Sequence, residues 1–443
     1  MLIAGRTIQG AGAGGMYVLL DIVCCDLVPL RERGKYLGLL FSWSGVAAAI
    51  GPPVGGALGS ANWRWIFYIN LPFCGMSLAG LLIFMSLKTG IATGSAPRQG
   101  TFASRAGRID YIGNFIFIPS TVGLLIGLIE GGSEHPWSSW RILVPLVLGV
   151  LGLAAFAAHQ VFVAENPSIP SRLFGNRTSA VALLLTLTSS MLVQSVAYFF
   201  PVYLQAVQST TAKDSGTFFL PFALGSLVFA IIAGVLLSTV GMYRPIHALA
   251  FALSALGFGL FTRLDAATPK VAWVFFQLIA SAGSGLVMST LLPAIMAPLS
   301  EKDVASSSAL YSLVRTFGYI WGVVIPGVIF NAVFDKSLGD IPDQKLQSQL
   351  RGGGGYSFAS QAHELHSNYD ASTWEGVLNI YSKSLRTIWW VCLGLSLFSL
   401  LAVGLERDVE LRKELDTEFG LEDEKDKGAS GSEVVEKELP QGV

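Results

Sequence analysis

Long apolar stretches separated by shorter polar segments dominate the pattern along the chain. Each stretch contains few charged residues. An α-helix rises about 1.5 Å per residue, so about 20 residues cross the roughly 30 Å hydrocarbon layer of a membrane. The pattern predicts eleven spanning helices and hence an all-α integral membrane protein. Their approximate limits are residues 2–24, 36–59, 65–87, 110–130, 141–163, 179–205, 216–239, 244–263, 271–295, 306–333 and 383–405.

The second apolar stretch is unusually rich in glycine and proline. It contains Gly45, Gly51, Pro52, Gly55 and Gly56. Proline cannot donate a helix hydrogen bond, which predicts a bend, and glycines four residues apart form a flat strip where another helix can approach closely. A bent helix with such a strip fits a protein whose helices move against one another. Ordinary close packing of a membrane helix explains the same pattern and stays open as the alternative.

Composition and charge support a membrane protein and suggest its orientation. The chain is 52% hydrophobic and 13% charged, which is typical of the membrane class. One set of alternating loops carries eleven basic residues and the opposite set five. The richer set includes Arg31, Arg33 and Lys35 and is therefore predicted to be cytoplasmic. No basic run with interleaved aromatic residues occurs, so nucleic acid is not an expected partner.

Three polar segments lie outside the predicted spans. Residues 89–109 are rich in Gly, Ser and bases and are expected to form a cytoplasmic linker. Residues 335–382 are polar and contain four consecutive glycines, which predicts a flexible external loop. Residues 406–443 hold 13 acids and 6 bases. This composition predicts an acidic cytoplasmic tail that is disordered beyond a short surface helix at its start.

Arg6 lies near the start of the first predicted span, with Gln9 about one turn later on the same face. A guanidinium inside a membrane costs about 2.5–3.5 kcal/mol on insertion scales. Arg6 is therefore a candidate for a fixed positive charge that shifts the pKa of a nearby carboxyl group or holds an anion. An interfacial arginine bonded to lipid phosphate is the alternative.

The short connection after the first span carries Asp26, Arg31, Arg33 and Gly34. An acid at one helix end and bases shortly after it can tie two helices together by ion pairs. If the helices separate when the protein changes shape, that tie acts as a latch. A plain basic cytoplasmic loop is the alternative interpretation.

Polar residues inside later spans are candidates for lining a cavity. Gln194, Tyr198 and Gln205 belong to the sixth predicted span and Arg315 to the tenth, whereas His247 is interpreted as an ordinary helix residue. No group of residues has the spacing of a metal site, and neither a phosphate-binding loop nor a nucleophile elbow occurs. The sequence therefore predicts no metal, no cofactor and no enzymatic activity.

The glycine-rich stretches resemble motifs of the major facilitator superfamily. Residues 5–12 (GRTIQGAG) look like the motif of the fourth span in that superfamily, and residues 45–56 (GVAAAIGPPVGG) resemble the antiporter motif of the fifth span. Residues 63–72 (WRWIFYINLP) are similar to the start of the sixth span in fungal fourteen-span drug:proton antiporters. The resemblance covers about residues 1–405 in register.

The resemblance implies a major facilitator fold with assigned roles. Proton coupling would involve Arg6 and Gln9, the helix interface that governs occlusion would comprise Gly45, Gly51, Pro52, Gly55 and Gly56, and the latch would comprise Asp26, Arg31, Arg33 and Gly34. Residues 1–88 would be a remnant of the N-terminal bundle, 110–163 a two-helix insert and 164–405 a six-helix C-terminal bundle. Because the predicted spans begin with the fourth-span motif, the first three of fourteen spans are expected to be absent from this sequence.

The expected function is proton-coupled efflux of drugs, toxins or other amphipathic small molecules across a lipid bilayer by alternating access. The plasma membrane is the expected location, with the vacuolar membrane as the alternative. Three other functions stay open. They are a substrate-specific exchanger or importer on the same fold (for an iron chelate or an amino acid), a non-transporting membrane sensor, and an inactive truncated product.

Overall fold

The computed structural model describes residues 1–62, 64–84, 109–300, 303–365 and 369–412. Within these ranges the chain is almost entirely helical, and the only β pairing is an isolated bridge between Gly131 and His135. The predicted all-α class is confirmed. The long helices are α1 (Leu2–Leu27), α2 (Leu30–Asn62), α4 (Asn70–Phe84), α6 (Tyr111–Glu130), α7 (Trp140–Phe162), α8 (Arg177–Val202), α10 (Leu220–Val240), α11 (Arg244–Phe261), α12 (Lys270–Met288), α14 (Val304–Ser337) and α18 (Ala371–Val403).

Shorter helices extend several of these. The segment α3 (Trp65–Tyr68) precedes α4, α9 (Ala212–Phe218) precedes α10, and α13 (Leu291–Met296) follows α12. In the described part of the chain, ten helical segments are long and apolar enough to cross a membrane. The remaining predicted span, 36–59, lies inside α2, whose 33 residues continue through Pro52 and Pro53. The bend at these prolines stays a prediction.

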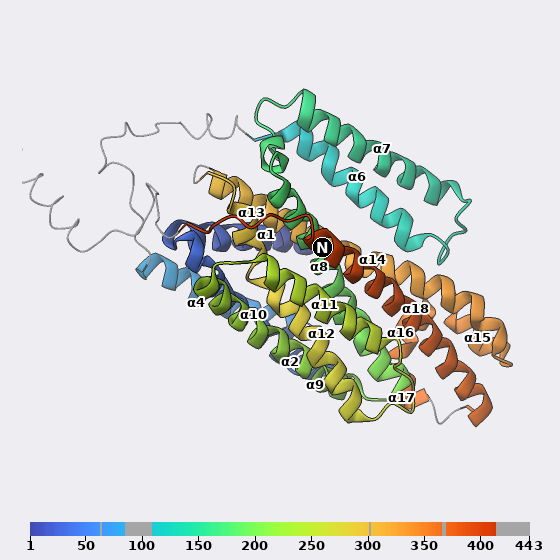
Figure 1. Cartoon of the computed structure of the whole chain (residues 1–443). Coiled ribbons are helices and arrows are strands. Elements are labelled where there is room, and N and C mark those ends of the chain that lie inside the picture. Colours follow the sequence, from blue (N-terminus) through green and yellow to red (C-terminus); the bar gives the residue numbers. More distant parts are fainter. Residues whose placement is uncertain (63, 85–108, 301–302, 366–368, 413–443) are drawn as a thin grey trace, which may run out of the picture.

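The C-terminal helices form one bundle. Helices α8, α10, α11, α12, α14 and α18 pack against one another, α2 runs along α10, and the end of α1 contacts α14 (Figure 1). Helices α6 and α7 pair with each other and lie beside the bundle, where the ring centroids of Phe117 in α6 and Phe317 in α14 are 6.2 Å apart.

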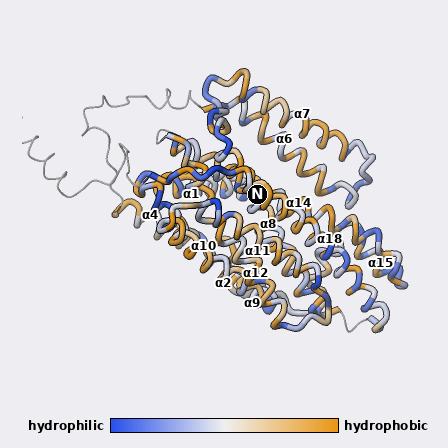
Figure 2. The backbone as a smooth tube through the Cα atoms, in the orientation of Figure 1, coloured by the Kyte–Doolittle hydropathy of each residue, from blue (hydrophilic) through white to orange (hydrophobic). Residues whose placement is uncertain are grey.

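The outward surface of the helices is apolar. No described residue of α4 is buried, although the helix is made almost entirely of apolar residues, and large side chains such as Phe115 and Phe162 on α6 and α7 are more than three-quarters exposed. Figure 2 shows apolar helix middles with hydrophilic segments gathered near their ends. Apolar surface of this extent marks contact with lipid rather than water, so the chain is a multi-pass membrane protein.

Two ends of the molecule can be told apart by their polar contacts. The end where α1 meets α2, here named the latch end, also contains Arg244, whose Nη2 donates to the Gly404 carbonyl at 3.2 Å. At the opposite end, His363 Nδ1 lies 2.6 Å from the Ser209 carbonyl oxygen. The structure thus groups Arg31 with Arg244, which is another of the eleven basic residues in the richer set of loops. Their cytoplasmic location stays a prediction.

The predicted external loop is largely helical. Residues 338–365 contain α15 (Gln344–Leu350), α16 (Gly354–Ala359) and α17 (Ala362–Leu365). Leu346, Leu350 and Phe358 are buried, and Tyr381 OH donates to the Gly355 carbonyl. The prediction of a flexible loop over 335–382 is therefore wrong for its described part. In this segment the apolar residues are spaced widely among polar ones. The mean hydropathy therefore does not reveal the helices that they form.

Helix α18 begins twelve residues before the predicted span 383–405. Asp370 caps it, with its carboxylate accepting a hydrogen bond from the Thr373 N–H at 3.1 Å. The added turns carry polar residues such as Glu375 and Asn379, which lower hydropathy without interrupting the helix. The predicted linker 89–109 lies outside the described residues except for its last position, and so does the tail beyond residue 412.

Candidate functional site

The connection between α1 and α2 attaches the N-terminal helices to α10. Arg31 donates from Nε to the Ser238 carbonyl and from Nη2 to the Thr239 carbonyl, both at 2.8 Å. These carbonyls belong to the last turn of α10, where carbonyl groups lack intrahelical partners and the helix dipole is negative. The helix stops at Gly241, whose φ of +79° suits glycine. Arg31 therefore caps a helix of the other half of the molecule.

Arg33 is fully buried at the same junction. Its Nη2 donates to the Cys25 carbonyl at 2.6 Å and its Nε to the Val28 carbonyl at 2.8 Å, while Nη1 lies 3.3 Å from Met296 Sδ of α13. Burial of a guanidinium is tolerated only when its donors are satisfied. Asp26 lies half-buried in the last turn of α1. The structure thus places Arg31, Arg33 and Gly34 at one junction, where both arginines donate to backbone carbonyls. The ion pairs predicted with Asp26 stay a prediction.

Glycines on α2 and α10 allow the two backbones to approach closely. A Cβ added to Gly234 would collide with the Gly34 carbonyl oxygen, and a Cβ on Gly38 would lie 2.7 Å from the Ala230 carbonyl oxygen. Any side chain at these positions would force the helices apart. Gly34 therefore serves as a packing residue of the latch. Gly38 makes the corresponding contact one turn later and was not singled out in the sequence.

The glycine strip predicted at 45–56 makes no such contact in the described residues. A Cβ on Gly51 or Gly55 would have no neighbouring atom within 4 Å. Gly45, Pro52 and Gly56 lie on α2, but their side-chain surroundings fall outside the described part. The interface role of these residues stays a prediction, while the observed close approach lies nearer the start of α2.

A buried charge pair joins α1 to α14. Asp21 has no exposed surface, and its Oδ2 lies 3.4 Å from Arg315 Nη2 and accepts a hydrogen bond from Ser312 Oγ at 2.7 Å. The Arg315 guanidinium also lies 4.9 Å from the ring centroid of Tyr311 and 5.6 Å from that of Tyr17. We name Asp21, Arg31, Arg33 and Arg315 the polar junction. In the sequence, Asp21 ends the first span together with Asp26, but no local pattern shows its partner Arg315, 294 positions away.

Arg6 and Gln9 meet as the helical spacing predicts. Arg6 Nη1 donates to Gln9 Oε1 at 3.0 Å, and its guanidinium lies 5.2 Å from the ring centroid of Phe67 in α3. Both Arg6 and Gln9 are exposed. About 15 residues, or roughly 22 Å along the helix, separate Arg6 from Asp21. The predicted role of Arg6 and Gln9 in proton coupling is not tested by this geometry.

The four predicted cavity residues do not form one cluster. Gln194 and Tyr198 lie one turn apart on α8, and Gln194 packs against α14 at Gly322. Gln205 lies in a π-helical turn after α8, and its Nε2 donates to Ser215 Oγ at 2.8 Å. Arg315 belongs to the polar junction instead. In the described ranges, no three His, Cys, Asp or Glu residues are grouped as a metal site would require.

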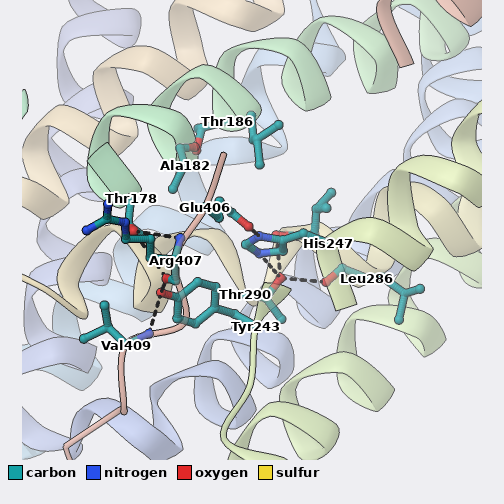
Figure 3. Close-up of polar contacts among 12 residues, drawn as sticks. Thr178, Ala182, Thr186, Tyr243, His247, Leu286, Thr290, Glu406, Arg407 and Val409 are labelled. Atoms are coloured by element: carbon teal, nitrogen blue, oxygen red, sulfur yellow. Dashed lines mark hydrogen bonds and ion pairs between the residues drawn. The ribbon is translucent and has the colours of Figure 1, made fainter. Parts of the chain in front are cut away.

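The segment after α18 is an extended strap across the latch end. We name residues 406–412 the C-terminal strap. Glu406 is buried, and both of its carboxylate oxygens lie 3.0 Å from His247 Nδ1 (Figure 3). His247 Nε2 lies 3.1 Å from Thr290 Oγ1, which itself donates to the Leu286 carbonyl at 2.9 Å. The His247 ring therefore links the carboxylate of the strap to Thr290, which follows α12.

Further hydrogen bonds hold the strap to both halves of the molecule. Tyr243 OH donates to the Arg407 carbonyl and accepts from the Val409 N–H at 3.1 Å. Burial raises the pKa of Tyr243 to about 12, so the hydroxyl remains a donor near neutral pH. The Arg412 carbonyl accepts from the Arg31 N–H at 3.0 Å. The sequence predicts a surface helix or a disordered tail from residue 406, and for the strap this prediction is wrong. The residues that hold the strap are distant in sequence, so local composition does not reveal them.

Comparison with known proteins agrees with the architecture. The family model described as Major Facilitator Superfamily matches residues 1–323. The MFS-type transporter ucsD of an Acremonium species is 45% identical over 98% of this chain and 73% of its own length. The MFS efflux transporter aclA of Aspergillus oryzae is 40% identical over 98% of this chain and 78% of its own length. The efflux pump FUS6 of Gibberella fujikuroi is 40% identical, with coverages of 96% and 76%.

Proposed function

The chain belongs to the major facilitator superfamily, and from that premise we propose that this membrane transporter exports amphipathic small molecules in exchange for protons. It is a transporter and not an enzyme. In alternating access, two helical halves rock about a central site so that it opens to one side of the membrane at a time.

Contact between the halves at one end is the observation that carries the proposal. Helices α1 and α2 meet the C-terminal bundle through the polar junction and through the glycine contacts at Gly34 and Gly38. Further along α2, Gly51 and Gly55 have no described neighbour within 4 Å of an added Cβ. This arrangement supports a conformation that is closed at the latch end. Breaking and remaking a limited polar contact is a plausible switch between two such conformations.

Export is favoured by the relatives rather than by the geometry. The proteins from Aspergillus oryzae and Gibberella fujikuroi carry the names efflux transporter and efflux pump. The proposed substrate class rests on the residues of α8 that the sequence predicts to line a cavity. There the polar groups of Gln194 and Tyr198 lie among apolar residues. An apolar site with few polar groups suits an amphipathic molecule. The lipid bilayer is the proposed partner of the apolar outer surface, and the plasma membrane its location.

Transport in vesicles tests the proposal. The purified protein is reconstituted with a trapped pH indicator, and an amphipathic cationic dye such as rhodamine 123 is added under an imposed proton gradient. We expect the dye to move against its gradient while protons move the other way. Vesicles in which the wild-type protein moves neither dye nor protons would contradict the proposed function.

The same vesicles test the predicted role of Arg6. Arg6→Ala is expected to abolish the gradient-driven part of dye movement, because the fixed positive charge is lost while the helix remains apolar. Arg263→Ala removes an exposed arginine at the end opposite the latch end and serves as the control. Proton flux in Arg6→Ala equal to that of the control would refute the assignment.

A further inference from the structure

We propose that Asp21 is a proton-carrying group whose protonation releases the closed latch end of the transporter. This inference rests on the proposed proton-coupled function. It concerns a residue that the sequence motifs do not single out, and it places a proton site about 22 Å along α1 from Arg6.

The surroundings of Asp21 are unfavourable for a permanent charge. The residue has no exposed surface. Oδ2 has two partners, Ser312 Oγ and Arg315 Nη2, but Oδ1 has no hydrogen-bond partner among the described residues. The 3.4 Å separation from Arg315 is long for a charge-assisted hydrogen bond, which is normally about 2.7–2.9 Å. A buried carboxylate that is only partly satisfied gains from accepting a proton.

The other titratable or charged groups around Asp21 come from each packed element. On α1 they are Tyr17, Cys24 and Cys25; on α2, Arg33; and on α14, Tyr311, Arg315 and Tyr319. Within this set Asp21 is the sole carboxyl group. Arg315 and the Ser312 hydroxyl favour its charged form, whereas burial favours its neutral form. A balance between opposing effects is what a group needs if it is to change protonation during a cycle.

Arg315 can remain charged when Asp21 becomes neutral. Its guanidinium lies over the faces of Tyr311 and Tyr17 at 4.9 and 5.6 Å, and a cation over an aromatic ring is stabilised by about 0.5–2 kcal/mol. Protonation of Asp21 therefore weakens the attraction between α1 and α14, of which the contact between Arg315 and Tyr17 remains, without leaving an unsupported cation. The carboxylate gains one proton, and no other covalent bond forms or breaks.

The position of the pair links the proton to opening. Asp21 belongs to the N-terminal helices and Arg315 to the C-terminal bundle, so the ion pair must break if the halves separate at the latch end. The charged pair stabilises the closed form and the neutral acid weakens it. Proton binding and opening are then thermodynamically linked, since each must change the equilibrium of the other by the same factor.

A buried thiol next to the pair provides a readout of opening. Cys25 has no exposed surface, and its Sγ lies 3.8 Å from Met296 Sδ across the junction. The experiment uses the full chain with Cys24, Cys74 and Cys392 replaced by serine. The rate of Cys25 alkylation by a maleimide is measured from pH 4.5 to 8.5 and divided by the rate for the same protein denatured at the same pH.

We expect this normalised rate to rise at least tenfold as the pH falls, because the neutral acid releases the latch end. Asp21→Asn mimics the neutral acid and should react fast at every pH. Asp214→Asn, at an exposed acid of α9, should behave like the parent protein. A pH dependence that persists in Asp21→Asn, or a rate that does not vary with pH in the parent, would overturn the proposal.

A second variant tests the proton site if Asp21→Asn fails to fold. Ser312→Ala removes the hydrogen bond to Oδ2 but keeps the charge of Asp21. The loss of one hydrogen bond to a charged group makes the carboxylate less favourable. The midpoint of the alkylation curve should therefore move upward by about one pH unit. A midpoint unchanged from the parent would count against Asp21 as the group that titrates.

Vesicle transport separates this inference from the proposed function. Dye movement that stays gradient-driven in Asp21→Asn would overturn the role of Asp21 and leave proton-coupled export intact. Dye movement that continues in Asp21→Asn but no longer responds to the proton gradient would support both. An alkylation rate that depends on Asp21 and pH, with no dye or proton flux in the parent, would support the proton site and contradict the proposed export.

Discussion

Gly38 shows that the absence of one atom, the Cβ, permits the close contact between α2 and α10. Its missing Cβ leaves room for the Ala230 carbonyl oxygen of α10, and Gly34 and Gly234 make a similar contact one turn away. The sequence predicted a glycine strip on this helix but placed it at 45–56. Glycine spacing alone does not show which face of a helix has a neighbour, so the residue type was predictable and the contact was not.

Replacement of Gly38 by leucine should separate α2 from α10. Overpacking of a close contact costs about 1–3 kcal/mol, so we expect Gly38→Leu to lower the thermal unfolding temperature of the detergent-solubilised protein and to reduce dye transport. Gly55→Leu is the matched comparison on the same helix. Because no atom of the described residues lies within 4 Å of a Cβ there, its unfolding temperature should equal that of the wild type.

The two variants together also test the predicted antiporter interface. Loss of transport in Gly55→Leu with unchanged stability would place the Gly55 contact in another conformation, as the resemblance implies. Wild-type stability in Gly38→Leu would refute the observed close approach.

Charged residues of the polar junction were predictable to different degrees. Arg31 and Arg33 stood out because bases cluster in a short loop, and both lie at the junction. The Asp21–Arg315 pair did not stand out, because its members are 294 positions apart in the chain. Each residue alone resembles a polar group at the end or in the middle of a span. Only their proximity indicates a shared role.

At the scale of elements, the C-terminal strap shows the limits of composition. Acidic residues dominate the chain after residue 405, yet Glu406 and Leu411 are buried and Arg412 Nη2 donates to the Leu299 carbonyl at 2.8 Å. The anchor is the Glu406–His247 pair. Nothing in the local sequence identifies a partner 159 positions away, so an average over the whole tail hides the strap and its two buried residues.

Removal of the strap should destabilise the C-terminal bundle. A chain that ends after Leu405 leaves His247 buried without its carboxylate, and breaking a buried pair in this way costs about 3–5 kcal/mol. We expect a lower unfolding temperature in detergent. A chain that ends after Arg412 keeps the strap and is the control, with the unfolding temperature of the full chain.

A double substitution separates the buried pair from the rest of the strap. His247→Phe with Glu406→Leu removes both partners and replaces them with apolar groups, so the full-length double variant should recover much of the stability that either single substitution loses. If the chains that end after Leu405 and after Arg412 were equally stable, the strap would contribute nothing to the stability of the bundle.

At the scale of the whole molecule, the testable property is which end of the molecule faces which side of the membrane. The structure places the α1–α2 connection, Arg244 and the strap at the latch end, and the segments around Ser209 and His363 at the other. Loop charges predict that the latch end faces the cytoplasm. Single cysteines replacing Lys35 and Arg172, both exposed, should therefore resist an impermeant maleimide applied to intact cells.

Cysteines replacing the exposed residues Lys213 and Glu375 should react with the same reagent and serve as the control for labelling. Modification of Lys35→Cys and Lys213→Cys from the same side would break the predicted order of spans. The mechanism proposed above depends on that order, since it requires the latch end to open and close on one face of the membrane.

The sequence by itself determined the solvent, the helices and the family. Apolar runs of spanning length depend only on local composition, because a bilayer requires every backbone group to bond within its own helix. The glycine and arginine motifs are likewise local, and they carried the resemblance that the family match bears out. These features persist whatever the neighbouring helices do.

Tertiary structure alone decided which polar groups meet. The Asp21–Arg315 pair, the capping of α10 by Arg31, the glycine contact at Gly38 and the anchor of Glu406 on His247 all join segments distant in the chain. Hydropathy describes how a residue interacts with its solvent, whereas a buried charge is stabilised by one particular partner. Helix packing selects that partner, and it also places Asp21 between α1 and α14.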